Sequence, residues 1–519
     1  TENRAMGSLP QNRRRVFNLL GDRMKPCILI LLLLNAVSGE SFSVRGGLVS
    51  PTLPSARASK TASISIASTL VGRGGAVAAS PSALADSEGV DLVPSTFNLI
   101  KNIVGAGVLS LPYGVAAFSN AKGSVLPACA LVMALGGLSC YSFILIGRLC
   151  EMTGTDTYRD AVNAALGPAA SQILALATTL KTLAACLMYS IIIGDTTASL
   201  ATTMGASAAF PSLFASRWKL LAGVTASVLT PLCLLRSFSF LAYTSLVGIA
   251  GTLYTAVFMG MRLLDGTYAP GGRFHIALAE AAAKGAGAAG AVLPSFGSAT
   301  NPAGAFILLS MLSTAFVAHY NAPRFYNTLK DNTVERFSKL SFAAFGAAAA
   351  IFASIMSFGY LTFGASTQGY VLNNYAATDP LATAARAAIL VSIVLGYPLT
   401  FVSFRDSVLE IVRGGGGAKD GSKPLPAAVS WRTKDLTGVA LLALITVAAT
   451  FLRNLGLVAS VGGAVLGSAV IYIFPALSFI AAAKQEKGSV NRSQEVSFNY
   501  ALAAIGALLG VIGTVVSLK

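Results

Sequence analysis

Apolar stretches of about 20 residues, nearly free of charge and each long enough to span a bilayer core of roughly 30 Å as a helix, recur along most of this chain. Gly, Pro, Asn or charged residues bound each stretch, as expected where a helix ends. The pattern predicts eleven transmembrane helices, at about 93–117, 124–148, 168–194, 217–235, 239–262, 303–321, 340–364, 384–404, 436–453, 457–482 and 497–517. We therefore expect an all-α, multi-pass integral membrane protein.

Composition and charge support this membrane environment. Hydrophobic residues make up 54% of the 519 residues, charged residues only 11%, and the mean hydropathy is +0.69. The formal net charge of +16 comes from Lys and Arg in the connectors and the N-terminal arm, which indicates membrane topology rather than a nucleic-acid-binding face. We expect the lipid bilayer as a partner and no nucleic acid. The connector charges place the N-terminus in the cytosol and the C-terminus on the other side.

Residues 1–92 form an arm that differs from the following domain, residues 93–519. The apolar run from Cys27 to Val37 follows several basic residues and is too short to span a bilayer, which is typical of a signal peptide. Residues 41–85 contain no Asp or Glu and are rich in Ser, as transit peptides are. These features resemble the two-part leaders of algae with complex plastids, and a disordered tail is the alternative. Plastid, endomembrane or vacuole, and plasma membrane stay open as locations.

The sequence gives little support to an enzyme or a metal protein. Six cysteines without paired spacing and two histidines make a disulfide framework or a zinc site unexpected. The spans hold no paired carboxylates and no nucleophile elbow. Gly414 to Gly417 lacks the phosphate-loop pattern and indicates a linker, and Glu280 to Lys284 favours a short surface helix. We expect no cofactor.

The first predicted span carries polar residues and two glycines, Gly105 and Gly107, where a plain membrane anchor has Leu or Ile. A helix in lipid opens only where its freed backbone groups find other partners. Opening at these glycines would begin a half-helix whose free N–H groups and positive dipole end face an anion. The spacing predicts a carboxylate site made from backbone. Close helix packing through small residues is the alternative.

The stretch from Ser95 to Gly114 resembles the first helix of the amino acid/auxin permease family. The resemblance continues in order through 188–195, 316–330, 358–364, 386–405 and 474–477. It implies an inverted five-plus-five repeat carrier fold in which helices 1 and 6 are interrupted beside the substrate. The implied function is secondary active transport of an amino acid substrate. An amino acid sensor or scaffold that transports little is the alternative.

The resemblance also implies three sets of substrate-binding residues. They are backbone N–H groups that hold the carboxylate, side chains on the ion or substrate side of helix 1, and hydroxyls that approach from helix 6. In that order they are Gly105, Ala106 and Gly107; Asn98 and Asn102; and Ser313 and Thr314. His319 is interpreted as a packing and hydrogen-bonding residue at the exit of helix 6. Asp195 is expected to face water at the end of helix 3.

We predict symport driven by a cation gradient, of protons rather than sodium. Where sodium-coupled relatives are expected to present a hydroxyl ligand, helix 8 holds Val394 and Gly396, and Ser392 is the nearest hydroxyl. Lys181 lies near the middle of helix 3, where a charge costs at least about 2.5–3.5 kcal/mol on insertion scales. It is therefore a candidate for reversible protonation. Lys181 and Ser392 are the ion-coupling candidates, and snorkelling or pairing with a helix carbonyl is the alternative for Lys181.

Overall fold

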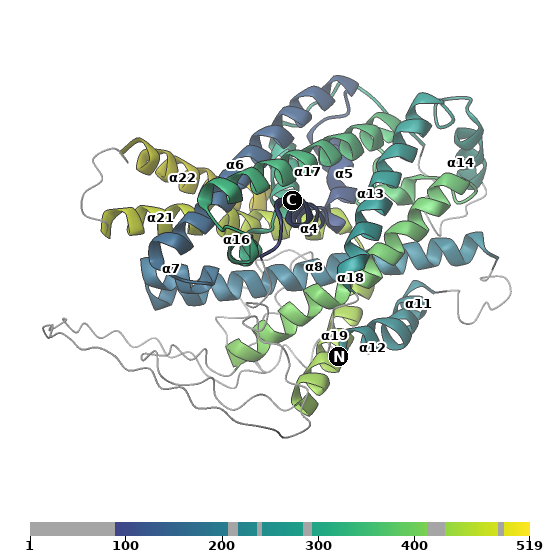
Figure 1. The fold of residues 1–519 in the computed structure, drawn as a ribbon. Helices are drawn as coiled ribbons and strands as arrows, with labels where there is room; N and C mark the ends of the chain where they lie inside the picture. The colour runs from purple at the N-terminus through teal and green to yellow at the C-terminus, as the bar shows by residue number, and fades with distance from the viewer. Residues whose placement is uncertain (1–88, 206–215, 236–240, 284–292, 413–430, 486–492) are drawn as a thin grey trace, which may run out of the picture. The chain divides into compact units, whose positions relative to one another are not determined.

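The computed structural model describes residues 89–205, 216–235, 241–283, 293–412, 431–485 and 493–519. These residues fold into helices, with isolated bridges and no β-strand among them (Figure 1). The predicted leader before residue 89, the linker at 414–417 and Lys284 lie outside this part of the chain. The first described helix begins at Leu92, and the division of the chain at residue 92 stays a prediction.

The first and sixth predicted spans are each assembled from several helical pieces. The first consists of α4 (Leu92–Ile103), η2 (Ala106–Ser110) and α5 (Leu111–Phe118), and the sixth of η5 (Pro302–Gly304), α15 (Ala305–Ala315), η6 (His319–Asn321) and α16 (Ala322–Thr328). Between them lie η3 (Lys122–Ser124), α6 (Val125–Thr153), α7 (Tyr158–Leu166), α8 (Pro168–Thr203), α11 (Arg217–Val224), η4 (Thr225–Leu229), α12 (Thr230–Cys233), α13 (Leu241–Leu264) and α14 (Arg273–Ala283). After them come α17 (Val334–Phe363), η7 (Val371–Asn374), α18 (Pro380–Val412), α19 (Trp431–Phe451), α20 (Leu455–Val461), η8 (Gly462–Gly467), η9 (Ala469–Ile473), α21 (Phe474–Gln485) and α22 (Ser493–Leu518).

Nine helices of the described part are long and apolar enough to cross a membrane, and a tenth span results if the bent pair in the first span counts as one. These helices confirm an all-α, multi-pass membrane protein. The predicted span at 217–235 is helical but divided into α11, η4 and α12. The residues that follow it lie outside the described part. The count of eleven helices therefore stays a prediction.

The third span, α8, lies at the centre of the helix contacts that matter for the site. It packs against α7, α11, α18 and α19 (Figure 1). It also packs against α20 and touches η2, at the start of the second half of the first span. The helix begins at Pro168. Proline suits the first helical position because a backbone N–H there would have no acceptor inside the helix. Side chains of α8 can therefore reach the first, eighth and tenth spans.

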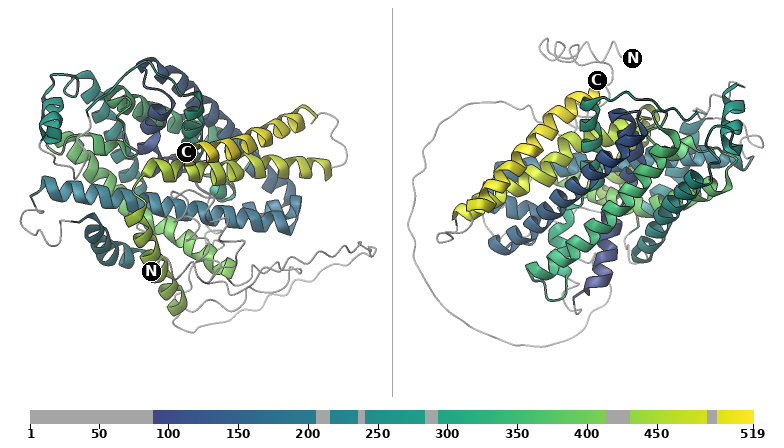
Figure 2. Two further views of the ribbon diagram at one scale, coloured as in Figure 1. Left: turned by 180° about the vertical axis from the view of Figure 1, so that it is seen from behind. Right: turned by 90° about the horizontal axis from the view of Figure 1, so that it is seen from above.

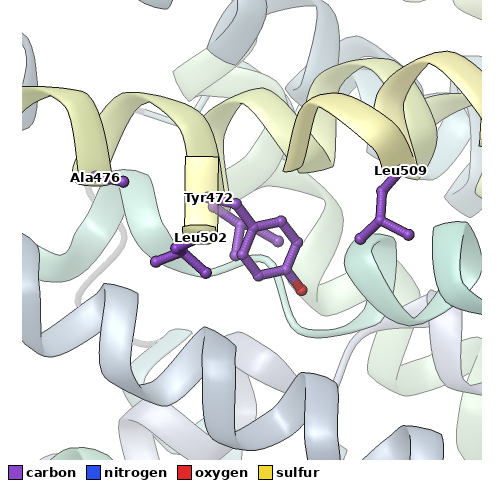
Figure 3. Packing of buried hydrophobic residues seen from close by; sticks show 5 residues of the cluster. Tyr472, Ala476, Leu502 and Leu509 are labelled. Atoms are coloured by element: carbon purple, nitrogen blue, oxygen red, sulfur yellow. The ribbon is translucent and has the colours of Figure 1, made fainter. Parts of the chain in front are cut away.

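The last two spans approach each other closely. Figure 2 shows α21 and α22 side by side from two further directions. Tyr472 and Ala476 pack against Leu502 and Leu509 of α22, as Figure 3 shows. A Cβ on Gly506 would lie 2.8 Å from the Cβ of Tyr472, so the backbone of α22 passes too close for a side chain there. In lipid, such close packing of small residues holds helices together.

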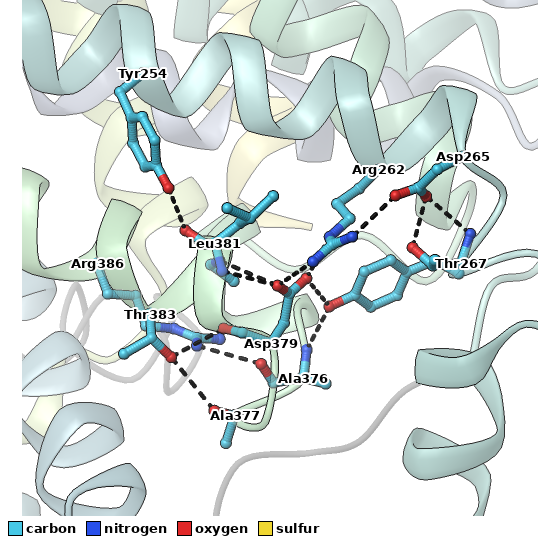
Figure 4. A network of polar contacts seen from close by, with 12 residues as sticks. Tyr254, Arg262, Asp265, Thr267, Ala376, Ala377, Asp379, Leu381, Thr383 and Arg386 are labelled. Atoms are coloured by element: carbon cyan, nitrogen blue, oxygen red, sulfur yellow. Dashed lines mark hydrogen bonds and ion pairs between the residues drawn. The ribbon is translucent and has the colours of Figure 1, made fainter.

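A buried ion pair fixes the connector that precedes α18. Arg262 of α13 donates from Nε and Nη2 to the carboxylate oxygens of Asp379 at 2.9 and 2.7 Å, and the Asp379 side chain is 0% exposed (Figure 4). The hydroxyl of Tyr268 donates to the same carboxylate at 3.0 Å. Arg386 donates from Nη2 to the carbonyl of Tyr375 at 2.6 Å. Charge-assisted hydrogen bonds therefore join this connector to both α13 and α18.

The residues that lead into α4 are tied to the end of α16. Val90 donates its backbone N–H to the carbonyl of Thr328 at 2.9 Å and accepts a hydrogen bond from the N–H of Lys330 at 3.0 Å. Gly89 runs so close to this segment that a Cβ would lie 2.7 Å from the Cα of Lys330. The start of the first span and the end of the sixth are therefore joined through their backbones.

Candidate functional site

The first span is broken at the position that its glycines predicted. α4 ends at Ile103, Val104 and Gly105 leave the helical conformation, and η2 begins at Ala106. The two halves of the span meet at an angle of 44°. Gly105 has φ −107° and ψ −161°, an extended conformation that residues with side chains also adopt. The backbone geometry of the break therefore does not by itself require glycine.

The break narrows the set of N–H groups that can bind a carboxylate. Gly105 donates its N–H to the carbonyl of Ile103 at 2.9 Å, so this group is already used. Ala106 and Gly107 open the next helical segment, and the first N–H groups of a helix have no acceptor inside it. No acceptor for these two groups is found elsewhere in the described part of the chain. The N–H groups of Ala106 and Gly107, at the positive end of the segment, are those that suit an anion.

Helix packing does not explain the two glycines at the break. A Cβ on Gly105 would meet only a tyrosine hydroxyl, 3.6 Å away, and one on Gly107 would lie 3.4 Å from the Cα of Ala315, an ordinary contact distance. At Gly463, by contrast, a Cβ would overlap the carbonyl oxygen of Ser310. The close-packing interpretation fits Gly463. The missing side chain of Gly105 leaves room beside the free N–H groups, whereas Gly107 lies in ordinary contact with Ala315 of the sixth span.

The sixth span is broken as well, at residues 316–318 between α15 and η6. Thr314 lies just before this break and faces the first span, because its Cγ2 is 3.6 Å from where a Cβ on Gly107 would lie. Ser313 is also buried, but its hydroxyl donates to a carbonyl of its own helix at 3.1 Å and it lies against Gly467 of the tenth span. Both residues therefore contact the tenth span, and of the two only Thr314 also lies beside the break.

Lys181 reaches the same place from α8. Its side chain is 2% exposed, and Nζ donates to Oγ1 of Thr314 at 3.2 Å. The Thr314 hydroxyl in turn donates to the carbonyl of Ala459 in α20 at 2.6 Å. The partner of Lys181 is thus a hydroxyl inside the protein, rather than the membrane surface or a helix carbonyl. Its ammonium group is held beside the break in the sixth span.

Asn102 brings the two breaks together. Asn321, at the end of η6, donates from Nδ2 to Oδ1 of Asn102 at 3.0 Å. The Nδ2 of Asn102 is buried and has no partner among the described residues. A buried donor of this kind costs free energy unless a ligand or water accepts from it. Asn98 is not brought into this set, because it lies exposed one turn earlier in α4.

A second lysine, which the sequence reasoning missed as a candidate, lies on the first span. Lys101 of α4 donates from Nζ to Oγ of Ser392 in α18 at 2.9 Å. Gly248 of α13 makes room for this contact, since a Cβ there would overlap the Nζ of Lys101. The available signal was its position, a charged residue one turn before a predicted break in a membrane helix. Ser392, the predicted ion-coupling hydroxyl, therefore has a lysine as its partner.

Two further polar residues are held in structural contacts. His319 is fully buried and lies 2.9 Å from the hydroxyl of Ser142, which agrees with the packing and hydrogen-bonding role expected of it. The expectation that Asp195 faces water at the end of helix 3 is wrong. The helix α8 continues past it, and Arg217 of α11 donates to its Oδ1 at 2.5 Å. The helix is longer than its charge-poor stretch, and a salt bridge replaces water around Asp195.

These features define a multi-pass membrane protein in which two interrupted helices meet at their breaks around buried polar groups. The chain belongs to the transmembrane amino acid transporter family, whose model matches residues 91–519. This is a family of membrane transporters and not of enzymes. Within the described residues, no group of three or more His, Cys, Asp and Glu side chains is placed to hold a metal ion.

Individual relatives are similar along most of their length. Amino acid transporter AVT6E of Arabidopsis thaliana is 25% identical over 446 residues, covering 83% of this chain and 85% of its own. Sodium-coupled neutral amino acid transporter 7 of Mus musculus is 25% identical over 438 residues, covering 82% and 86%. Among solved structures, a sodium-coupled sialic acid symporter has 14% identity and a TM-score of 0.45, covering 82% of this chain and 90% of its own. That score is too low to support an argument, so the inverted repeat stays a prediction.

Proposed function

We propose that this chain is a secondary active transporter of amino acids that works by alternating access. The observation that carries the proposal is the pair of backbone N–H groups, those of Ala106 and Gly107, that have no acceptor in the described part of the chain at the break of the first span. Gly105 keeps a side chain away from these N–H groups, although neither packing nor backbone geometry demands a glycine there. A zwitterionic amino acid presents the carboxylate that such donors bind. The buried, unpartnered Nδ2 of Asn102 offers a further donor to the same ligand.

The contacts of the two membrane lysines support coupling to protons rather than to sodium. Ser392 is the hydroxyl nearest in sequence to the helix 8 positions where sodium-coupled relatives are expected to present a ligand. It already accepts a hydrogen bond from Lys101. A lysine brings a positive charge to this position and gains or loses it by exchanging a proton. Lys181 is the second candidate, since its described partner is also a hydroxyl. Loading and release of a proton at either lysine would couple its gradient to the movement of substrate.

Uptake by purified protein in proteoliposomes tests the proposal. Labelled glutamate, glutamine or alanine is offered with and without sodium, and with and without a pH gradient of either sign. We expect accumulation that needs the pH gradient, persists without sodium and collapses when a proton uncoupler is added. Lys101→Met is expected to abolish the response to the gradient, while Lys339→Met, at an exposed lysine paired with Glu335, is expected to leave it unchanged.

The possible results separate the alternatives. Strict sodium dependence with no response to the uncoupler would exclude proton coupling and leave the transport proposal standing. Saturable binding of an amino acid without uptake in any condition would favour the sensor or scaffold. The absence of both binding and uptake would reject the site at the break.

A further inference from the structure

Lys181 and Lys101 differ from several other cations of the described helices in their partners. Four arginines form salt bridges with carboxylates, namely Arg148 with Glu495, Arg217 with Asp195, Arg262 with Asp379 and Arg405 with Asp406. The described partners of the two lysines are instead the hydroxyls of Thr314 and Ser392. A positive charge taken out of water is costly unless an anion pairs with it. Among the described residues, no carboxylate is paired with either lysine.

Lys181 is linked to the candidate carboxylate site through Thr314. Its ammonium touches Thr314, which is the residue that faces Gly107 across the two breaks. An ammonium group has three N–H donors, and Thr314 takes one of them at 3.2 Å. The other two have no partner among the described residues. Because Thr314 lies in the last turn of α15, the negative end of that helix also favours a cation at this point.

From this arrangement we infer that the transporter carries amino acids with an anionic side chain, and that Lys181 is the counter-ion for that side chain. The inference rests on the proposed function, because it needs the substrate's α-carboxylate at Ala106 and Gly107. Aspartate and glutamate have a second carboxylate that can reach beyond the first toward the sixth span. There it accepts hydrogen bonds from the free donors of Lys181.

The charges of the complex favour this class of substrate over the others. An acidic amino acid carries one net negative charge, so its pair with protonated Lys181 is neutral inside the membrane. Glutamine has nearly the shape of glutamate but offers only a neutral acceptor, which makes a weaker hydrogen bond to an ammonium group. Lysine or arginine as substrate would add a second positive charge to a place that already holds an unpaired one. We expect acidic substrates first, neutral ones second and cationic ones last.

Exchange measurements on reconstituted full-length protein test the inference. Proteoliposomes are loaded with unlabelled glutamate or glutamine, and entry of the labelled form of the same amino acid is measured at equal pH on both sides. Because no gradient is present, a change in proton coupling does not affect the result. The variants are Lys181→Met, which removes the charge at similar volume, and Lys339→Met, which makes the same change at an exposed residue.

We expect the wild type and Lys339→Met to exchange glutamate at least as fast as glutamine. In Lys181→Met the ratio of glutamate to glutamine exchange should fall by about tenfold or more, because a buried charge pair is lost. Retained glutamine exchange shows that this variant is folded. If Lys181→Met exchanges neither substrate, Lys181→Arg, which keeps a positive charge, is measured instead. Exchange of glutamine without exchange of glutamate in Lys181→Arg would overturn the inference.

Two further results would overturn the inference without touching the proposed function. One is a wild type that exchanges glutamine but excludes glutamate, which rejects the substrate class. The other is a Lys181→Met variant with an unchanged ratio, which removes Lys181 from substrate recognition. If the wild type exchanges no amino acid at all, the proposed function itself fails.

Discussion

Asn321 donates a hydrogen bond from its Nδ2 to Oδ1 of Asn102 at 3.0 Å, and this contact joins the breaks of the two interrupted helices. The first half of the first span, α4, and the last piece of the sixth span, α16, are joined again at their other ends, where Val90 pairs with Thr328 and Lys330. The helices α4 and α16 are thus tied at both ends. We expect them to move as one unit when the transporter changes between its two open states.

The two asparagines are expected to differ in their effect on substrate binding. Asn321→Ala removes only the tie, whereas Asn102→Ala also removes the buried Nδ2 that has no described partner. We therefore expect Asn102→Ala to raise KM for uptake by about tenfold, as for the loss of one buried hydrogen bond to a charged group. Asn321→Ala should mainly lower kcat. Equal changes in KM in both variants would show that Asn102 acts only through its hydrogen bond with Asn321. Asn327→Ala, at an exposed residue, is the control.

Three glycine substitutions should separate ligand space from packing. Gly107→Leu is expected to abolish uptake while expression stays largely intact, because the side chain would block the N–H groups at the break. Gly463→Leu is expected to prevent folding, since even a Cβ there overlaps the backbone of α15. Gly137→Leu, where a Cβ meets nothing within 4 Å, should do neither. Uptake and the yield of monodisperse protein are the measurements. Normal uptake by Gly107→Leu would reject the site at the break, and loss of monodisperse protein would assign that glycine to packing.

Gly248→Ala is expected to weaken coupling without touching either lysine. The added methyl group would overlap Lys101 Nζ and force it away from Ser392. We expect accumulation driven by a pH gradient to fall several-fold, while exchange at equal pH is retained. Gly346→Ala is the matched control, since its Cβ would meet nothing within 4 Å. Unchanged accumulation in Gly248→Ala would mean that the Lys101–Ser392 contact is not part of the coupling step.

Asp379→Asn should destabilise the protein strongly. The variant leaves Arg262 without its buried charge partner, and loss of one member of such a pair costs about 3–5 kcal/mol. Asp265→Asn removes a partly exposed partner of the same arginine, and such pairs contribute at most about 1 kcal/mol. Thermal unfolding in detergent should therefore show a large drop in Tm for Asp379→Asn and a small one for Asp265→Asn. Similar shifts in both would contradict a structural role for the buried pair.

The charges of the connectors predict the orientation of the chain. The loop around Lys423 should be cytosolic and Lys519 should lie on the opposite side of the membrane. Glycosylation acceptor sites introduced separately at the two positions test this in a translocating membrane system. We expect modification of the site at 519 alone, and modification at 423 without modification at 519 would reverse the orientation.

The sequence predicted the spans and the first break well because both depend on local patterns. Charge-poor stretches of the right length mark helices in lipid, and the glycines with neighbouring asparagines mark where a helix opens. The break at Val104 and Gly105 is present, and Asn102 and Thr314 lie beside it. The actual end of α8 was missed, because Asp195 ends the charge-poor stretch while the helix continues to Thr203, and the partner of Asp195, Arg217, lies on another helix.

Contacts between distant segments account for the rest of what the sequence could not reveal. Lys101 and Ser392 are 291 positions apart, and nothing in the local pattern around either residue indicates that they meet. The local pattern likewise does not show which of Ser313 and Thr314 lies beside the break. These adjacent side chains leave a helix in different directions. The packing of α15 against both η2 and the tenth span decides that Thr314 lies beside the break and Ser313 does not.

The pairing of Val90 with Thr328 and Lys330 also limits how the N-terminal arm can be processed. A peptidase that cut beyond Val90 would remove backbone partners from the end of α16 and release the first span from the sixth. Cleavage that keeps this connection has to occur at or before Gly89, whichever targeting signal the arm contains. For the same reason, a purification tag that replaces the residues before Gly89 preserves the connection, whereas a tag fused directly to α4 displaces it.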